Sequence, residues 1–335
     1  MRQFLLTCGI VWLMAGAAFA GETLANVKSS KMLRCGVSTG IPGFSERSAD
    51  GHWSGLDVDF CRAVAAAVLG DPKRVSYKAL PTLARFTALM SGEIDILARN
   101  TTWTLRREVA LRIVFTGPLV YSAQGVLVKA ESGICKISDL DNTKICVVKD
   151  STQDASLHFW AMRKGFHIEK LGFDTDEEAR DGFFQGACQG YASDALLLAA
   201  MRLKAPGGKD AYGIIKDDRT LDPLSPAVRQ GDAEWRQLVE AVWASLLLAE
   251  EYGLAQKDVM PDAPMSPAKE AFLHKSDAMA KNFGIEPGWA ARAVAGAGNY
   301  GEMFQRNLGS GSPLGLERGP NRLWSQGGLM VPPDF

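Results

Sequence analysis

Two arginines lie where a helix disfavours positive charge, in the stretch N-T-T-W-T-L-R-R-E, residues 100–108. The apolar segment 94–98 predicts a strand, and Thr104 is a suitable N-cap for a helix that follows, so Arg106 and Arg107 fall in its first turn. The helix dipole makes each exposed cation there unfavourable by about 0.3–1 kcal/mol. An anion would reverse this, because a guanidinium matches a carboxylate and the helix start offers free N–H groups. The pattern therefore indicates a carboxylate-binding site.

The first twenty residues have the pattern of a secretory signal peptide. Arg2 gives a positively charged start, residues 4–15 form a mostly apolar core, and Ala18-Phe19-Ala20 is an A-x-A cleavage site. The core is too short to span a membrane, and no later apolar run in the sequence is long enough. We therefore expect export to the periplasm, with a mature chain that begins at Gly21.

Length and composition favour a soluble protein of two domains. Of the 335 residues, 47% are hydrophobic and 22% charged, which is ordinary for a globular protein. A mature chain of roughly 300 residues exceeds what one hydrophobic core usually covers. The formal charge of −1 becomes −2 when Arg2 is lost, which gives no sign of a nucleic-acid partner.

Five of the six cysteines follow the predicted cleavage site. No C-x-x-C occurs and the histidines are scattered, so we expect no zinc site and no other cofactor. An oxidising compartment favours disulfides. From their places in strand-like and helical segments we predict the pairs Cys35–Cys61 and Cys146–Cys188, with Cys135 unpaired. Buried free thiols are the alternative.

Strand and helix patterns alternate along the chain in two series. The first series is strand 31–38, helix 57–69, strand 75–79, helix 83–90 and strand 94–98. The second is strand 144–148, helix 151–164, strand 167–171, helix 176–185, strand 190–193 and helix 194–204. This alternation predicts an α/β fold with mainly parallel sheets covered by helices.

Extended segments 114–129 and 221–230 connect these series, and helix 232–253 is expected to return to the first one. We therefore expect two lobes that face each other over a cleft and are joined by two strands. The expected boundaries are 21–120 and 225–296 for lobe I, 121–224 for lobe II, and 297–335 for a C-terminal extension on lobe I. Ligands of parallel sheets bind at the carboxyl ends of strands. Segments 100–107, 149–154 and 193–194 lie at such ends.

Four blocks in order resemble the general L-amino-acid-binding proteins of bacterial polar amino-acid ABC transporters, in solute-binding protein family 3. The blocks are G-L-D-V-D-F-C-R-A-V-A-A-A-V-L-G-D, R-F-T-A-L-M-S-G-E-I-D-I-L-A-R-N-T-T-W-T-L-R-R-E, L-S-P-A-V-R-Q-G-D-A-E-W and N-Y-G-E-M-F-Q-R-N-L-G-S-G-S-P-L. The resemblance covers nearly the whole mature chain. It implies a type II periplasmic binding-protein fold that closes on a free L-amino acid, as a monomer with permease and ATPase subunits as partners at the inner membrane.

The resemblance implies roles for three residues of lobe I. Arg107 occupies the family position that binds the ligand's α-carboxylate, and pairing with Glu108 or Asp95 is the alternative. Thr102 and Asn100 occupy strand-end positions that bond the ligand's amino and carboxylate groups. For Asn100 the alternative is a role in shaping the turn. Arg106 is expected to face solvent.

On lobe II, the loop K-D-S-T-Q-D places Ser151 and Thr152 where the family grips the carboxylate. N-capping by Ser151 is compatible with that role. Asp150 stands where the family usually has glycine, which leaves the shape of the loop open. Asp194 matches the acid that pairs with the α-ammonium group, and the alternative is an N-cap worth about 1 kcal/mol. With the arginine and the acid on different lobes, a zwitterion would favour the closed state.

For the side-chain pocket, the resemblance implies Arg85 and, beside it, Thr82. A second arginine of the acidic-ligand relatives is not found near residues 38–41, and one cation predicts tolerance for several polar side chains. Phe44 and Trp53 are candidates for an aromatic wall. The alternatives are a solvated helix position for Arg85 and core packing for Trp53.

Two other classes of function remain as alternatives. Some proteins of this fold are dehydratases of small carboxylic acids, which need a positioned acid or base. No histidine or nucleophile–base pair lies in the segments assigned to the cleft, so we expect no enzyme. A sensor that docks on a membrane receptor is the other alternative, and amino-acid binding would discriminate against a purely structural role.

Overall fold

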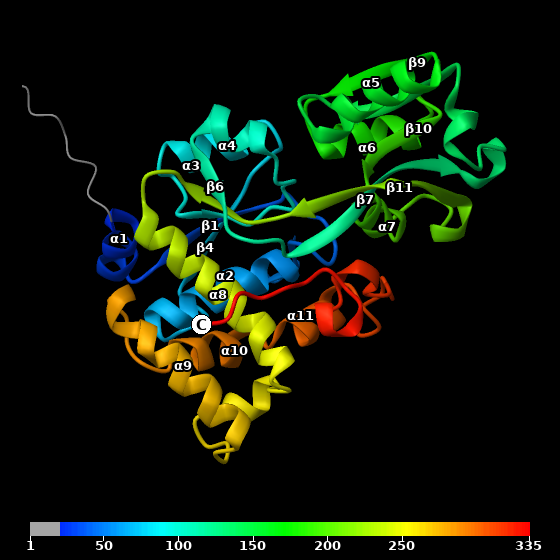
Figure 1. Ribbon diagram of the computed structural model, residues 1–335. Coiled ribbons are helices and arrows are strands. Elements are labelled where there is room, and N and C mark those ends of the chain that lie inside the picture. The colour runs from blue at the N-terminus through cyan, green and yellow to red at the C-terminus, as the bar shows by residue number, and fades with distance from the viewer. Residues whose placement is uncertain (1–20) are drawn as a thin grey trace, which may run out of the picture.

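The computed structural model describes residues 21–335, so the predicted signal peptide, residues 1–20, lies outside the described residues. Two lobes are joined by a pair of long strands (Figure 1). The helices are α1 Glu22–Ser30, α2 Leu56–Leu69, α3 Arg85–Met90, α4 Leu105–Leu111, α5 Thr152–Lys164, α6 Asp176–Phe184, α7 Ala195–Arg202, α8 Ala233–Glu251, α9 Pro267–Phe283, α10 Trp289–Ala297 and α11 Tyr300–Asn307. The strands are β1 Leu33–Val37, β2 Glu46–Arg47, β3 Trp53–Ser54, β4 Val75–Ala79, β5 Ile96–Leu97, β6 Ile113–Phe115, β7 Val120–Lys129, β8 Thr143–Val148, β9 Ile168–Phe173, β10 Gly190–Asp194, β11 Tyr212–Leu224 and β12 Ala227–Arg229.

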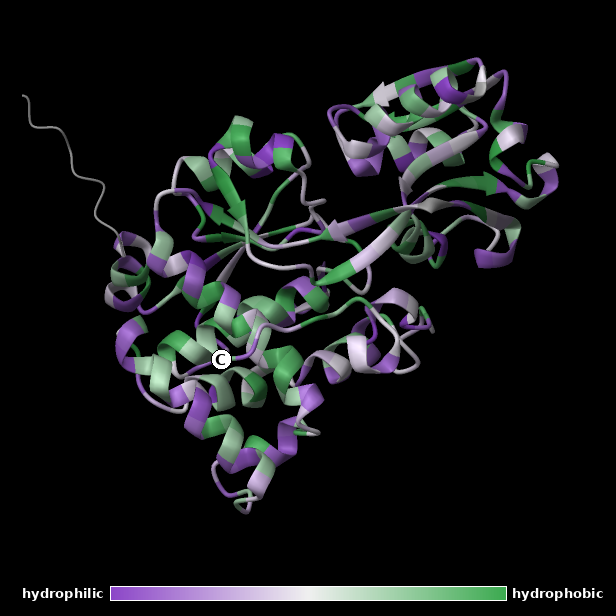
Figure 2. Ribbon diagram, in the orientation of Figure 1, coloured by the Kyte–Doolittle hydropathy of each residue, from purple (hydrophilic) through white to green (hydrophobic). Residues whose placement is uncertain are grey.

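Lobe I is built on a sheet in the order β4-β1-β5-β12-β6. β1 runs parallel to β4 and β5, whereas β12, which comes much later in the chain, is antiparallel to β5 and β6. Helix α2 is buried along nearly its whole length, and its alanines let α10 pack closely on it. A Cβ at Gly296 of α10 would lie 2.8 Å from the Cβ of Ala66. Figure 2 shows the hydrophobic colouring of this packed region of α2 and α10.

Lobe II is built on a second sheet, in the order β11-β7-β10-β8-β9. β8 is parallel to β9 and β10, and β7 is antiparallel to its two neighbours, β10 and β11. β7 and β11 are also the two strands that run between the lobes (Figure 1). Each strand series of the sequence thus forms most of one sheet, and the carboxyl ends of β5, β8 and β10 point toward the other lobe.

Both predicted disulfides are confirmed. Cys35 on β1 is bonded to Cys61 on α2, and Cys146 on β8 to Cys188 just before β10. Cys135 is a free, exposed cysteine. Each bond ties a strand of one sheet to a neighbouring element of the same lobe, so neither bond restricts movement between the lobes.

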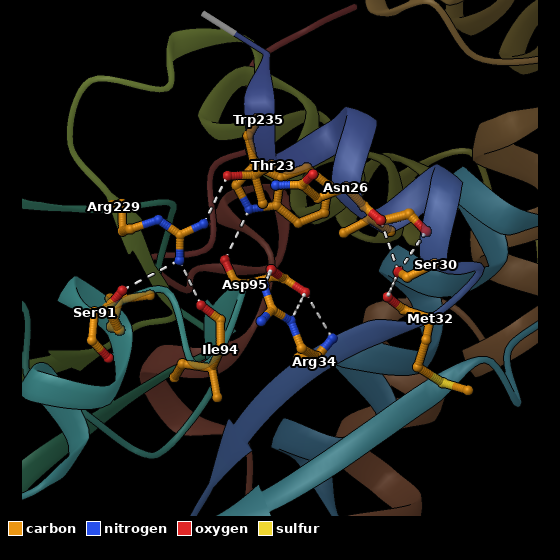
Figure 3. Close-up of polar contacts among 12 residues, drawn as sticks. Thr23, Asn26, Ser30, Met32, Arg34, Ser91, Ile94, Asp95, Arg229 and Trp235 are labelled. Atoms are coloured by element: carbon orange, nitrogen blue, oxygen red, sulfur yellow. Dashed lines mark hydrogen bonds and ion pairs between the residues drawn. The ribbon is translucent and has the colours of Figure 1, made fainter. Parts of the chain in front are cut away.

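The base of lobe I is tied together by side chains that reach across the sheet (Figure 3). Asp95 is almost fully buried, and its carboxylate accepts bonds from the backbone and the guanidinium of Arg34. Arg229 donates to the Ile94 carbonyl (2.6 Å) and to Oγ1 of Thr23 on α1 (2.9 Å). Asp95 therefore lies in a structural network far from the cleft and is not a partner of Arg107.

The C-terminal segment after α10 lies on lobe I and contacts the hinge. Asp59 of α2 accepts bonds from Arg306 (2.6 Å) and Asn307 (2.7 Å) of α11. Further on, Asn321 is buried, accepts from the Tyr121 backbone N–H (2.6 Å) and donates to its carbonyl (3.1 Å). Tyr121 lies opposite Pro223 in the β7–β11 ladder, and proline has no N–H to offer. The Asn321 amide therefore completes the hydrogen bonding of a hinge strand.

None of the helices in residues 21–335 is long and apolar enough to cross a bilayer.

Candidate functional site

A cavity of about 30 Å³ lies between the lobes, at the carboxyl ends of β5, β8 and β10. Its wall contains all eight predicted ligand-binding residues: Thr82, Arg85, Asn100, Thr102, Arg107, Ser151, Thr152 and Asp194. The remaining lining residues are Arg99, Val148, Gln153, Asp176, Ala192, Ser193 and Leu197. The structure brings the predicted residues together from both lobes. Their contact with a ligand remains a prediction.

Arg107 is placed by the cap of α4. Thr104 accepts from the Arg107 backbone N–H (3.2 Å), as expected for an N-cap, and the Arg107 guanidinium donates to the Thr102 carbonyl (2.6 Å). Burial, the largest influence, lowers the pKa of Arg107 to about 10. Glu108 is instead bonded to the Phe115 backbone N–H, so the pairing alternative for Arg107 is wrong. Arg106 is exposed, as expected.

Arg85 lies inside the cavity wall, so the alternative of a solvated helix position is wrong. Its side chain is 5% exposed, and its Nε has no hydrogen-bond partner among the described residues. Burial first, and then the nearby Arg99 and Arg107, lower the pKa of Arg85 well below its usual value. The ring of Phe86 lies 4.7 Å from the Arg85 guanidinium carbon and 5.4 Å from that of Arg107. Phe86 thus supports both cations through cation–π contacts.

Arg99 is a third arginine of the site, and it was not among the residues predicted from the sequence. It is 2% exposed, and it donates to the Leu80 carbonyl (2.7 Å), to Thr82 Oγ1 (3.1 Å) and to Asp176 of lobe II (3.1 Å). Thr82 also donates to Asp176 (2.8 Å). Burial opposes the charged form of Asp176, but Arg99 and Thr82 outweigh it, and the pKa of Asp176 is lowered.

This finding corrects the expectation of a single side-chain cation near Arg85. The second arginine comes from the end of β5 rather than from residues 38–41, immediately before Asn100. It is neutralised across the lobes by Asp176, however, so Arg85 and Arg107 are the lining arginines without an ion pair in the described chain. Strand-end position was the signal that could have found Arg99.

Asn100 and Thr102 flank the turn after β5. Asn100 adopts a left-handed φ of 37°, which fits the turn-shaping alternative, and its buried Oδ1 lacks a hydrogen-bond partner in the described residues. Thr102 Oγ1 lies 3.2 Å from Thr152 Oγ1 of lobe II, and its backbone bridges to Leu224 of β11. The two hydroxyls therefore meet across the cleft.

The lobe II loop has the left-handed backbone conformation that glycine, the usual residue of the family at position 150, adopts easily. Asp150 has a φ of 57°, so it adopts a left-handed conformation that favours glycine, and its side chain is exposed. Ser151 caps α5 by accepting from the Asp154 N–H (3.1 Å). Two residues further on, Gln153 is 7% exposed and its Nε2 has no partner among residues 21–335. The loop thus offers Thr152 and Gln153 to the cavity.

Asp194 stands at the N-cap position of α7, but its side chain makes no capping hydrogen bond. It is 4% exposed, and Oδ1 has no partner in the described part of the chain. Burial, and then the neighbouring Asp222, raise the pKa of Asp194 well above its usual value. The capping alternative is therefore wrong. The Gln153 side chain acts on this carboxyl, but Oδ1 has no hydrogen bond within the described chain.

The predicted aromatic wall is wrong. Phe44 is fully buried in the lobe I core, and Trp53 packs against Tyr77 with ring centroids 5.8 Å apart. Neither lines the cavity, and Phe86 is the aromatic residue that touches its cations. Spacing could not distinguish these aromatic residues, because each lies near a segment that was assigned to lobe I.

The cavity presents separated charges to a small molecule. The buried guanidinium of Arg85 and the half-buried guanidinium of Arg107 lie on lobe I, and the carboxyl of Asp194 lies on lobe II. Buried polar groups normally find partners, so the unpaired atoms of Arg85, Asn100, Gln153 and Asp194 indicate a site for a polar ligand. The lining includes no histidine or cysteine, and residues 21–335 contain no metal-ligating cluster. The arrangement suits a zwitterion that carries at least one carboxylate.

Comparison with known proteins agrees with this geometry. The bacterial extracellular solute-binding proteins, family 3, match residues 33–258. The chain is 37% identical to the general L-amino acid-binding periplasmic protein AapJ of Rhizobium johnstonii, over 99% of both chains. It is 38% identical to the glutamate/glutamine/aspartate/asparagine-binding protein BztA of Rhodobacter capsulatus, over 96% of both.

A solved structure agrees with most of the described fold. It is an ABC transporter periplasmic binding protein from Brucella ovis with glutathione bound, and it is 37% identical to this chain. The TM-score is 0.88, and the match covers 93% of this chain and 98% of that one. The predicted α/β fold of two lobes and two hinge strands is confirmed.

Proposed function

Because the chain belongs to the bacterial extracellular solute-binding proteins of family 3, we propose that it captures free L-amino acids in the periplasm and delivers them to an ABC permease. The ligand lies between the two lobes, and the mature chain acts as a monomer with permease and ATPase subunits as partners. The chain performs no chemistry on its ligand. Relatives that bind amino acids, at 37–38% identity over almost their whole length, support this assignment.

The single observation that carries the proposal is the set of unpaired, buried polar atoms of opposite character in one inter-lobe cavity. Arg107, with Thr102, Ser151 and Thr152, binds the α-carboxylate, because a guanidinium and a helix start favour it. Asp194 binds the α-ammonium group. Arg85 faces the ligand's side chain.

Binding couples to closure because the two charges belong to different lobes. Arg107 comes from α4 and Asp194 from the end of β10, so either lobe alone satisfies only one end of the zwitterion. Direct bonds between the lobes add to this: Thr102 meets Thr152, Arg99 meets Asp176, Thr39 bonds Glu177 and Lys204 bonds Glu46.

The test is isothermal titration calorimetry of residues 21–335, stripped of ligand, against L-glutamate, L-glutamine, L-histidine and L-leucine. Saturable binding of several amino acids is expected, with glutamate above leucine because Arg85 is a buried cation without an ion pair in the described chain. Absence of binding by a folded protein would contradict the proposal, and turnover of a carboxylic acid would favour an enzyme instead.

A second ligand class is favoured by a neighbouring cavity. A space of about 380 Å³ adjoins the site, shares Asp176 with it, and is lined by Ile41 and Pro42 of lobe I and Phe184 and Met201 of lobe II. A ligand with a long side chain, such as a γ-glutamyl peptide, would extend past Asp176 into this space. Glutathione, bound in the Brucella ovis relative, is the probe, and the same calorimetric titration tests it.

A further inference from the structure

The two hinge strands, β7 and β11, carry polar side chains beside Asp194 in the lobe II sheet. The β7–β11 ladder is regular as far as the pair Gln124–Asp217, and it resumes at Ser122–Asp222, so β11 bulges between Asp217 and Asp222. Bulges re-aim side chains and often lie beside functional sites. Here the bulge brings Asp222 back to Gln124, whose Nε2 donates to Asp222 Oδ2 (2.8 Å).

The bulge is fixed by further hydrogen bonds. The backbone N–H of Gln124 donates to Thr220 Oγ1 (2.8 Å), and Thr220 donates to the Asp217 carbonyl (2.8 Å). Gln124 itself is 5% exposed, and its Oε1 is a buried acceptor without a partner among residues 21–335. The Gln124 amide is therefore bonded through Nε2 and lacks a partner at Oε1. Such a buried, unpaired acceptor indicates a place for a further polar group.

Gln124 links Asp222 to the predicted ligand site. Asp194 is directly opposite Gln124 in the β10–β7 ladder, and directly opposed side chains of antiparallel strands lie on the same face. Asp222 is therefore one side chain away from Asp194. We propose that Asp222, held by Gln124, is a second carboxylate at the cation-binding end of the cleft, where it positions and strengthens Asp194 for the ligand's ammonium group.

The charges around these carboxyls support a shared function. Asp194 faces Asp222 from β11, Arg107 from α4, Arg85 from α3 and Asp176 from α6, and Asp176 is already neutralised by Arg99. Burial raises the pKa of Asp222, although Gln124 and Arg107 oppose this shift. Burial also raises the pKa of Asp194, and this shift is the larger of the two. Two nearby carboxylates repel each other, and the ammonium group of the ligand offsets this repulsion. Where the pair carries a proton before binding, the ammonium group replaces that proton, which passes to the solvent.

This inference rests on the proposed function, and its test compares two ligands that differ only at the α-nitrogen. L-Glutamate and (S)-2-hydroxyglutarate are titrated into residues 21–335 and into D222N at pH 7, in buffers of different ionisation enthalpy. D222N retains an oxygen that can accept from Gln124 but removes the charge. We expect D222N to bind glutamate about tenfold more weakly and hydroxyglutarate almost unchanged. Proton release per bound glutamate should be smaller in D222N than in the wild type.

Two control variants separate charge from structure. T220V disturbs the bulge without changing charge, so it should weaken both ligands equally and leave proton release per bound glutamate intact. D174N removes an exposed carboxylate that pairs with Lys149 and should match the wild type in both quantities. Equal loss of both ligands in D222N, or an unchanged ligand ratio and proton release, would overturn the assignment of Asp222. Failure of the wild type to bind either ligand or any amino acid would instead contradict the proposed function.

Discussion

Replacing Arg107 with alanine should abolish most ligand affinity while leaving the ligand-free protein almost as stable as before. The guanidinium is mostly buried and lacks an ion pair in residues 21–335, so the protein alone gains little from its charge. A carboxylate ligand would supply a partner of opposite charge. Deleting one side of such a desolvated charged contact costs about 2–5 kcal/mol, which corresponds to roughly 30-fold to 4000-fold in Kd.

The stability of the ligand-free protein follows from offsetting contributions. R107A loses one hydrogen bond to Thr102 (2.6 Å) and one cation–π contact with Phe86 (5.4 Å), together worth about 1–3 kcal/mol. It also relieves the burial that lowers the pKa of Arg107 to about 10, which costs the native state roughly 3 kcal/mol. The free energy of unfolding should therefore change by only about 1 kcal/mol.

The assay combines calorimetry with urea unfolding of ligand-free protein. The matched control is R106A, which removes a neighbouring, exposed arginine from the same helical turn and should change neither quantity. Arg107 is not the carboxylate-binding residue if R107A binds amino acids like the wild type, or if its main effect is a loss of several kcal/mol of stability with affinity retained.

Three further perturbations test interactions that stabilise the structure around the site. N321A removes both hydrogen bonds to the Tyr121 backbone and should lower the free energy of unfolding, measured in urea, by about 1–3 kcal/mol. An unchanged free energy of unfolding would show that the C-terminal segment does not stabilise the hinge. Burial raises the pKa of Asp57 to about 7, so the native state binds its proton more tightly than the unfolded chain does. The contribution of Asp57 to the free energy of unfolding should therefore fall by roughly 3–5 kcal/mol as the pH rises from about 4 to about 7. D57N should remove that fall, and an identical pH profile would contradict it. Replacing Cys35 and Cys61 with serine should cost about 3 kcal/mol, since the bond closes a loop with a sequence separation of 26, and thermal melting with and without reductant checks this.

Much of the fold was predictable because local patterns and tertiary structure agree. The helix predicted at 57–69 is Leu56–Leu69, and the strand predicted at 75–79 is Val75–Ala79. The strand predicted at 94–98 shrinks to Ile96–Leu97, because only those residues pair with β1 and β12. Segment 114–129 forms two strands, since Gly117 and Pro118 interrupt it.

The site was predictable where a residue's position violates an ordinary preference. Arg107 in a first helical turn indicates an anion from the sequence alone, whereas the role of Asp194 was implied by the family resemblance, because aspartate is ordinary at a helix start. Asp176 and Asp222 carry no such signal, and the strand-end position of Arg99 does not identify its partner. Arg99 meets Asp176 across the lobes, and Asp222 meets Gln124 only through a bulge. Such pairings follow from strand register and lobe closure, which sequence patterns do not specify.

The most direct measurement is a crystal structure of residues 21–335 grown with L-glutamate. We predict one glutamate between the lobes, with its α-carboxylate on Arg107, its α-ammonium on Asp194 Oδ1, and its side-chain carboxylate near Arg85. A glutamate bound elsewhere, or bound in the cleft with its ammonium group away from Asp194, would show that these residues do not form the amino-acid site.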